Sequence, residues 1–215
     1  MVIDWTNLQA FYGKLGFQAW KKYRMLAESQ GDALNESLIA RSLGVSRPSV
    51  ARSLGALEEA GLLRALPSLP GPAGKRARLS PAFYLRDSGL YHALSGLAGT
   101  DALLGSARLA SSWEGYAIEQ ILRVLPRGVE AGRYRSQDGA GLELVLSRGG
   151  RPLAGAAIRW ARPGGTVPKG ARIAASDLAT ARNYLVLPEA EEAELGGAFM
   201  RIGLARFLEE VSALP

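Results

Sequence analysis

The sequence predicts a protein of mixed α+β / α/β class, with an N-terminal winged helix-turn-helix followed by a mixed-sheet domain. Two observations lead to this prediction. Residues 35–66 contain two short amphipathic helices, separated by a glycine, and then the start of a strand. Beyond residue 100, an amphipathic helix precedes several apolar strands that then alternate with helices, an order typical of a mixed sheet. We expect one domain over residues 1–100 and a second over residues 101–215.

The first part of the chain predicts two helices ahead of a turn. Residues 8–29 have a helical pattern, and the side chains available for a core are Phe11, Leu15, Trp20, Tyr23 and Leu26. The next helix is expected within residues 35–43, and the side chains on its apolar face and turn are Leu38, Ile39, Leu43 and Val45. Gly44 stands where the turn needs a left-handed backbone conformation.

The second helix of the pair has the features of a recognition helix. Ser46 can cap its N-terminus, and Pro48 is tolerated in the first turn. The stripe at i, i+4, i+7 that would be buried is Val50, Leu54 and Leu57, which leaves Arg47, Ser49 and Arg52 outside. Since the N-terminal residues of such a helix lead into the DNA major groove, we expect these three side chains to contact DNA.

A wing is expected after the helix pair. Gly61 ends the second helix, residues 62–66 begin a strand, residues 68–77 form a turn, and residues 78–87 return as the second strand. Lys75, Arg76 and Arg78 would cluster at the tip and on the return strand, where they can contact DNA phosphates. The alternative is that they form a solvated basic loop.

The second domain is expected to begin near Leu103, after a short helix at 89–97, with a helix over residues 111–125 that buries Trp113, Ala117, Ile121 and Leu125. Strands are predicted at 133–137, 141–147, 152–160, 184–188 and 199–203, with a turn at 137–141 and a loop at 161–170. Helices are predicted at 177–183, over the acidic residues 188–195, and at 205–211.

Composition and charge limit the classes of function that the chain can have. The 215 residues include no Cys, which excludes disulfides and thiolate metal sites, and neither a membrane-spanning segment nor a signal peptide is evident, so we expect a cytoplasmic protein. The net charge is +6. Residues 1–92 carry 12 basic and 7 acidic side chains, and residues 93–215 carry 14 and 13. This indicates an anionic partner near the helix pair, although a preponderance of Arg is also what biased coding composition produces.

A second group of residues bears on nuclease chemistry: Glu114 and Glu119 on the helix, Glu143 on the second strand, and Ala157 and Arg159 on the third. A two-strand, metal-dependent nuclease needs an acid on one strand and Glu-x-Lys on the next, because Mg²⁺ takes carboxylate and water ligands. Alanine offers no ligand, and arginine does not give up its proton. We therefore expect a vestigial site in which Glu143 and Arg159 form an ion pair and no metal is bound. The alternative is that Glu114, Glu119 and Glu143 together bind Mg²⁺.

Two other motifs carry no chemistry. The segment GPAGKRA, residues 71–77, resembles a phosphate loop, but its glycine spacing is short and Arg76 stands where Ser or Thr would hold magnesium, so we expect no ATP binding. His92 is the only histidine and has no nucleophile motif near it, so we expect a packing or surface role. No cofactor is expected.

Several segments resemble the carboxy-terminal region of a large prokaryotic family of AAA-type ATPases. The most specific is KRARLSPAFYLRDSGLYHAL, residues 75–94, which is similar to that family's wing and the segment after it. LGVSRPSVARSLGALEEAGLL resembles its helix-turn-helix, SSWEGYAIEQIL the helix before its restriction-endonuclease-like fold, and GAGLELVLSRGGRPLAGAAIRWARP two core strands of that fold.

The resemblance implies a winged helix joined to a degenerate PD-(D/E)xK nuclease-like domain. It also implies an upstream AAA module, which this chain lacks, so the chain is expected to be part of a longer ATPase. By resemblance, Glu143, Ala157 and Arg159 stand where the family has Asp, Glu and Lys, whereas Glu114 and Glu119 match its acidic helix positions. All three strand residues depart from the family pattern.

These observations lead to one main expectation and two alternatives. The main expectation is a non-catalytic module that binds double-stranded DNA through the winged helix and works with the ATPase module. The first alternative is a docking or oligomerisation module that binds a protein or a second copy. The second is an active Mg²⁺-dependent nuclease.

Overall fold

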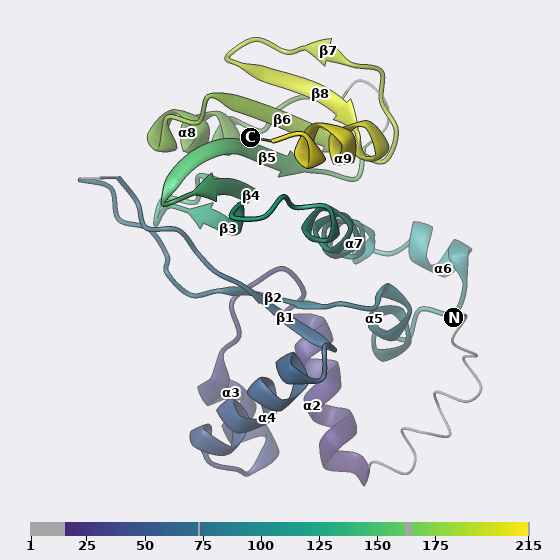
Figure 1. Cartoon of the computed structure of the whole chain (residues 1–215). Coiled ribbons are helices and arrows are strands. Elements are labelled where there is room, and N and C mark those ends of the chain that lie inside the picture. Colours follow the sequence, from purple (N-terminus) through teal and green to yellow (C-terminus); the bar gives the residue numbers. More distant parts are fainter. Residues whose placement is uncertain (1–15, 73, 162–164, 215) are drawn as a thin grey trace. The chain divides into compact units, whose positions relative to one another are not determined.

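The computed structural model describes residues 16–72, 74–161 and 165–214, with side chains from residue 21 onward. The chain forms two compact units, and the backbone of both is drawn in Figure 1. Unit 1 comprises Met1–Ala65 and Ala82–Gly115; unit 2 comprises Leu66–Pro81 and Tyr116–Pro215. The expected helical residues 8–15, with Phe11 and Leu15, lie outside the described residues, as does the side chain of Trp20.

Unit 1 is mainly helical. In chain order its elements are α2 (Gly16–Glu28), α3 (Glu36–Leu43), α4 (Arg47–Glu59), β1 (Leu63–Leu66), β2 (Ala82–Leu85), α5 (Ser88–Leu94), α6 (Thr100–Leu104) and the first half of α7 (Leu109–Arg123). Strands β1 and β2 pair in a two-stranded sheet. The return strand is therefore shorter than expected and begins at Ala82, so Arg78 lies in the preceding loop rather than in a strand.

The ends of α3 and α4 confirm the capping predictions. Gly44 follows α3 in the left-handed conformation, with φ of 66°. The Ser46 side chain accepts a hydrogen bond from the Ser49 N–H at the start of α4, and Pro48 lies in the first turn. Gly61 follows α4 with φ of 69°. These residues fix where both helices stop and start.

The core of unit 1 contains the predicted stripe of α4 (Val50, Leu54 and Leu57) together with Ile39 of α3 and residues of α2, β1, β2 and α5. The prediction for Leu38 and Val45 was wrong, because their exposed fractions are 48% and 46%. An eight-residue helix buries a narrow face; here it consists of Ile39 and Ala40, and Leu38 lies about 100° around the helix from Ile39.

Unit 2 is built on a mixed sheet, as the sequence predicts, but the sheet has six strands rather than the five predicted. Its strands are β3 (Glu130–Arg135), β4 (Gly141–Arg148), β5 (Arg151–Ile158), β6 (Arg182–Leu187), β7 (Ala193–Glu194) and β8 (Phe199–Gly203). Their order across the sheet is β3-β4-β5-β6-β8-β7. Pairs β3–β4, β4–β5 and β7–β8 are antiparallel, whereas β5–β6 and β6–β8 are parallel.

Helices α8 (Lys169–Leu178) and α9 (Leu204–Ser212) pack on this sheet, α8 against β4 and α9 against β6 and β8. The prediction of this helix at residues 177–183 was wrong, because α8 ends at Leu178 and β6 begins at Arg182. The buried stripe of α8 is Ala171, Ala174 and Ala175, and alanine's small size makes such a stripe hard to recognise in the sequence. The acidic segment 188–195 contains no helix; Ala193 and Glu194 pair with β8 instead. That segment has several like charges and no apolar stripe to bury, so helix propensity alone does not stabilise it.

No helix among the described residues combines the length and the apolar composition needed to cross a membrane.

Candidate nucleic-acid interface

The N-terminal turn of α4 holds the three side chains predicted to contact DNA. Arg47 and Arg52 are exposed and Ser49 is half-buried. Arg47 donates from Nε to Glu36 at 2.9 Å, an exposed pair of little energetic weight. Ser49 Oγ lies 3.0 Å from Ser46 Oγ and 3.4 Å from Arg52 Nη2. The structure thus places these hydroxyls and guanidinium groups together at the start of one helix.

The other three predicted residues, Lys75, Arg76 and Arg78, belong to unit 2 rather than to the unit that contains α4. They lie in the segment Leu66–Pro81, which we call the arm. All three side chains are exposed. Lys75 Nζ lies 3.2 Å from Asp177 Oδ1, and Arg78 Nη2 donates to the Gln137 carbonyl at 3.4 Å.

The arm is held along β3 by backbone hydrogen bonds. On the first limb, Leu69 N–H donates to the Arg133 carbonyl at 2.7 Å and Arg133 N–H to the Pro67 carbonyl at 2.8 Å. On the second limb, Arg78 N–H donates to the Arg135 carbonyl at 2.8 Å. The guanidinium of Arg133, which is only 5% exposed, donates to Ser68 Oγ and to the Ser80 carbonyl. No pattern in the sequence indicates that this expected hairpin tip belongs to the edge of another sheet.

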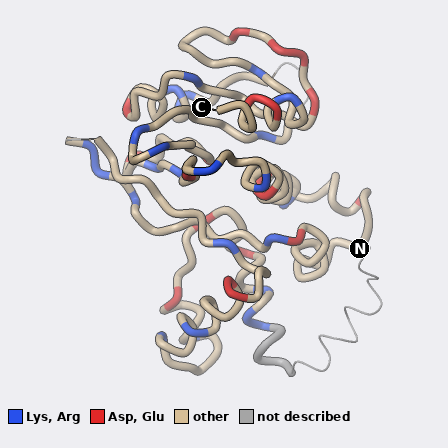
Figure 2. The backbone as a smooth tube through the Cα atoms, viewed as in Figure 1, with Lys and Arg blue, Asp and Glu red and all other residues tan. Residues whose placement is uncertain are grey.

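Because the arm belongs to unit 2, most of the positive excess also belongs to unit 2. Unit 1 carries 10 Lys and Arg against 9 Asp and Glu, and unit 2 carries 16 against 11. The expectation that the positive excess accompanies the helix pair was therefore wrong, because the arm's three cations belong to unit 2. Figure 2 shows acidic positions along the segment between β6 and β8, whereas basic positions mark the arm.

The strand residues of the nuclease-like pattern form the predicted ion pair. Glu143 is buried on β4, and its Oε2 lies 2.7 Å from Arg159 Nη1, just beyond the end of β5. The same oxygen accepts a hydrogen bond from the Ile158 N–H at 3.3 Å. Ala157 is fully buried beside them. The Glu143 carboxylate is thus already neutralised by an arginine.

The helix acids occupy different surroundings. Glu114 lies in unit 1 and accepts a hydrogen bond from the Tyr84 hydroxyl at 2.7 Å. Glu119 lies in unit 2 and is 2% exposed. Across the described residues, no cluster of three or more His, Asp or Glu side chains could hold a metal ion. The carboxylates of the nuclease alternative are not gathered into such a group.

His92, the single histidine, has a packing role in unit 1. Its Nε2 shares a hydrogen bond with Ser112 Oγ at 2.6 Å. Burial lowers the pKa of His92 below its ordinary 6.5, although the nearby Asp87 opposes this shift.

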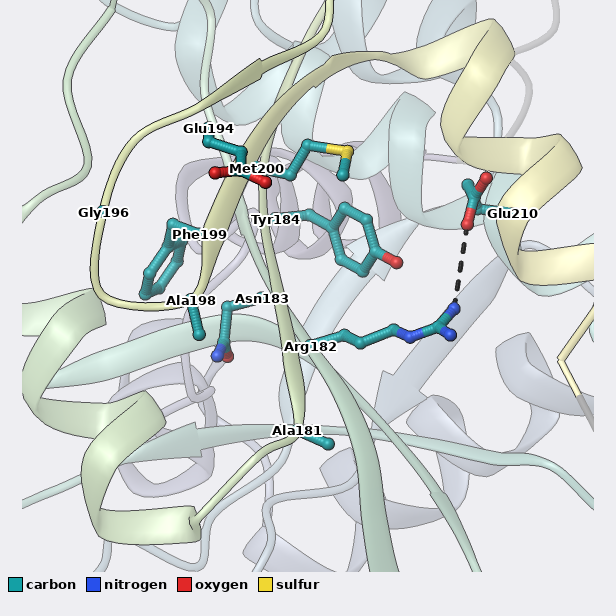
Figure 3. Close-up of a pocket in the computed structure, with 10 residues that line it drawn as sticks. All are labelled: Ala181, Arg182, Asn183, Tyr184, Glu194, Gly196, Ala198, Phe199, Met200 and Glu210. Atoms are coloured by element: carbon teal, nitrogen blue, oxygen red, sulfur yellow. Dashed lines mark ion pairs between the residues drawn. The ribbon is translucent and has the colours of Figure 1, made fainter.

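A small pocket that the sequence did not reveal opens in unit 2 (Figure 3). Its volume is about 340 Å³, and its wall combines the aromatic side chains of Tyr184 and Phe199 with Met200 and Glu194. Arg182 Nη1 and Glu210 Oε2 lie 3.9 Å apart on one side. Burial raises the pKa of Tyr184, and the Glu210 carboxylate adds to this effect. These residues come from β6, β7, β8 and α9, so the pairing of β8 with both β6 and β7 brings the strand residues of the pocket together.

The fold and these sites define an α+β protein with a capped helix pair in one unit and a six-stranded mixed sheet in the other. Residues 20–101 match the family described as a domain of unknown function, DUF8612. The chain is 35% identical over 169 residues to uncharacterized protein Rv2008c of Mycobacterium tuberculosis and, equally, to uncharacterized protein Mb2031c of Mycobacterium bovis. Each match covers 78% of this chain and 37% of the relative, so the chain spans little more than a third of these relatives. No solved structure matches.

Proposed function

We propose that this chain is a non-catalytic module that binds double-stranded DNA, with unit 1 acting as a winged helix and α4 as its recognition helix. The observation that carries the proposal is the start of α4, where the Ser46 cap orients the helix end and Arg47, Ser49 and Arg52 project from it. Within the described residues, Arg47 uses only Nε in its pair with Glu36, so its Nη groups are available to a phosphate or a base edge.

The arm supplies further cations to the proposed DNA partner. Lys75, Arg76 and Arg78 are exposed on unit 2 and can neutralise backbone phosphates. This unit is the degenerate PD-(D/E)xK nuclease-like domain of the proposal. Its Glu143–Arg159 pair and Ala157 support a role in positioning DNA rather than cutting it.

A gel-shift titration at two salt concentrations tests the proposal. Arg47→Ala/Arg52→Ala should weaken binding at least tenfold, because each lost contact of this kind costs about 1–3 kcal/mol. Lys22→Ala/Arg24→Ala removes the same charge from α2 and serves as the matched control. Equal binding by wild type and the α4 variant would refute the role of α4.

We further propose that the chain works as the C-terminal region of an AAA-type ATPase. The support is the resemblance of residues 75–94 to that family's wing segment, together with the greater length of the relatives, which leaves 63% of each outside the 37% that matches. Sequencing the coding region on the amino-terminal side of Met1 tests this, since a Walker-type phosphate loop is expected there. A coding region with no such motif would contradict it.

Exposed apolar side chains favour protein docking as a second candidate function. Leu38 and Val45, at 48% and 46% exposure, lie on α3 and the turn before α4. Contiguous exposed apolar patches mark protein contact surfaces, and these two side chains would contribute to such a patch. If docking is the function, the chain will form a stable oligomer in light scattering that Leu38→Ser/Val45→Ser dissociates, and it will not bind DNA at low salt.

A further inference from the structure

A polar hollow of about 750 Å³ lies within unit 2, where the arm passes the turn between β3 and β4 and the beginning of α8. The arm contributes Lys75 and Arg76, the turn contributes residues 136–140, and α8 contributes Lys169, Gly170 and Asp177. The volume is in the range of sites that hold a nucleotide-sized ligand. Three segments that are remote in sequence thus enclose one space.

The charged groups of the hollow are not equivalent. Asp177 is already satisfied, because it accepts a hydrogen bond from the Tyr134 hydroxyl at 3.2 Å and pairs with Lys75 at 3.2 Å. Burial raises the pKa of Tyr134, and the Asp177 charge adds to the rise, so this hydroxyl stays protonated as a donor. Arg76 and Lys169 are exposed and make no ion pair within the described residues. The free charge of the hollow is therefore mainly cationic, with Asp138 as the opposing acid.

The backbone around the hollow is adapted to close approach. A Cβ on Gly71 would meet the Lys75 carbonyl oxygen at 2.5 Å, so this tight turn of the arm requires glycine. A Cβ on Gly170 would lie 3.4 Å from Ala140 Cα, which shows how closely α8 approaches the β3–β4 turn. Gly71 thus shapes the arm itself, and Gly170 lies where α8 contacts the β3–β4 turn.

Within unit 2, the excess of positive charge lies in the part of the sequence that contains the hollow. Residues 66–81 and 116–188 carry 14 Lys and Arg against 5 Asp and Glu, whereas residues 189–215 carry 2 against 6. The field of the first group concentrates anions around it. The second group, whose acids lie on β7, on α9 and in the segment just before β7, repels them.

We propose that the hollow binds a phosphate group, with Arg76 and Lys169 as its direct partners and Lys75 held beside them by Asp177. If the phosphate belongs to a nucleic-acid strand, the inference rests on the proposed function. The same cations could instead bind the phosphate of a free compound. A phosphate seated here would fix the strand against unit 2, independently of α4.

Salt-dependent DNA binding by the full chain tests the role of the two cations. Arg76→Ala/Lys169→Ala should lower the slope of log affinity against log salt by about 1, since the single phosphate contact that both cations make contributes about 0.9. Affinity should fall on the order of tenfold. Arg127→Ala/Arg151→Ala removes two exposed arginines of unit 2 that do not line the hollow and should leave the slope nearly unchanged.

Amide chemical shifts identify the source of the phosphate. Titration with a DNA duplex and, separately, with inorganic pyrophosphate should be followed at the Gly139 and Gly170 N–H signals. Shifts with DNA alone support a nucleic-acid strand, and shifts with pyrophosphate support a free phosphate compound. No shift with either ligand, together with an unchanged salt slope, overturns the proposal. If the wild type binds no DNA, the proposed function fails, and the pyrophosphate titration still decides whether the hollow binds phosphate.

Discussion

Glu143 on β4 and Arg159, one residue beyond β5, form an ion pair in which Oε2 and Nη1 are 2.7 Å apart. Their side-chain exposures are 7% and 35%, so the carboxylate is buried and the guanidinium reaches solvent. Glu143 therefore depends on Arg159 for neutralisation, and the Ile158 N–H supplies a second interaction. At this scale, one neighbouring arginine neutralises the buried carboxylate.

We expect Arg159→Met to destabilise the fold by about 2 kcal/mol, because it leaves a buried carboxylate without its counter-charge, an effect reduced by the partial exposure of the arginine. Glu143→Gln/Arg159→Met should recover most of this loss, since the neutral amide still accepts the Ile158 hydrogen bond. Urea unfolding of the single and double variants measures both effects. An equal loss in the two variants would contradict the ion-pair explanation.

His92 makes a pH-dependent contribution to stability. Because its pKa in the folded state is lowered from 6.5, the unfolded chain takes up the proton first as pH falls. The stabilisation is complete above pH 6.5 and is lost as pH drops through the folded-state pKa. The imidazole NMR signals should titrate below 6.5, and His92→Gln should flatten the dependence of unfolding free energy on pH below 6.5. A titration midpoint above 6.5 would refute this.

At the scale of elements, the arm covers the edge of β3. An uncovered edge strand exposes hydrogen-bonding groups to other chains, and covering it with a loop is a common solution. Here the cover is specific, because buried Arg133 reaches Ser68 on one limb and the Ser80 carbonyl on the other. The arm's position thus depends on one side chain as well as on backbone pairing.

Arg133→Leu should loosen the arm while the sheet remains folded. The substitution removes the hydrogen bonds to both limbs and leaves Ser68 and the Ser80 carbonyl without this partner. We expect faster amide hydrogen exchange at Leu69 and Arg78 and unchanged exchange at Val145 in the centre of β4. Arg148→Leu, at the exposed end of β4, is the matched control. Unchanged exchange in the arm would show that backbone pairing alone holds it.

At the scale of the whole molecule, positive charge and the predicted recognition helix belong to different units. Unit 1 has a small positive excess and contains α4, whereas unit 2 contains the arm and most of the net charge. If both units contact DNA, α4 provides contacts to base edges and unit 2 provides the electrostatic attraction. Variants in α4 should then change sequence preference, and variants in the arm should mainly change salt dependence.

We expect the chain to leave plasmid DNA uncut in the presence of Mg²⁺ or Mn²⁺. Ala157 offers no ligand where a carboxylate would be needed, and the Glu143 carboxylate is occupied by Arg159, which cannot act as a base. Agarose gels after prolonged incubation provide the measurement, with the Glu143→Ala variant prepared in parallel. Cleavage by wild type that disappears in Glu143→Ala would establish the nuclease alternative.

The predictions that succeeded depend on local rules. The cap at Ser46, the left-handed Gly44 and the stripe Val50, Leu54 and Leu57 all follow from interactions within about four residues. The Glu143–Arg159 pair was also predictable, because side-chain alternation along adjacent strands sets which residues face one another. The prediction of a helix over the acidic segment 188–195 was wrong. Helix propensity there is not supported by an apolar face that could pack against the rest of the protein.

The sequence by itself determined the helix pair, the succession of the main strands along the chain and the Glu143–Arg159 pair, because each depends on residue type and short-range spacing. Tertiary structure alone decided that the arm belongs to unit 2, that Asp177 holds Lys75, and that Lys169 lies across a hollow from Arg76. These contacts join residues about 60 to 100 positions apart, and their formation depends on which sheet edge the chain meets when it folds.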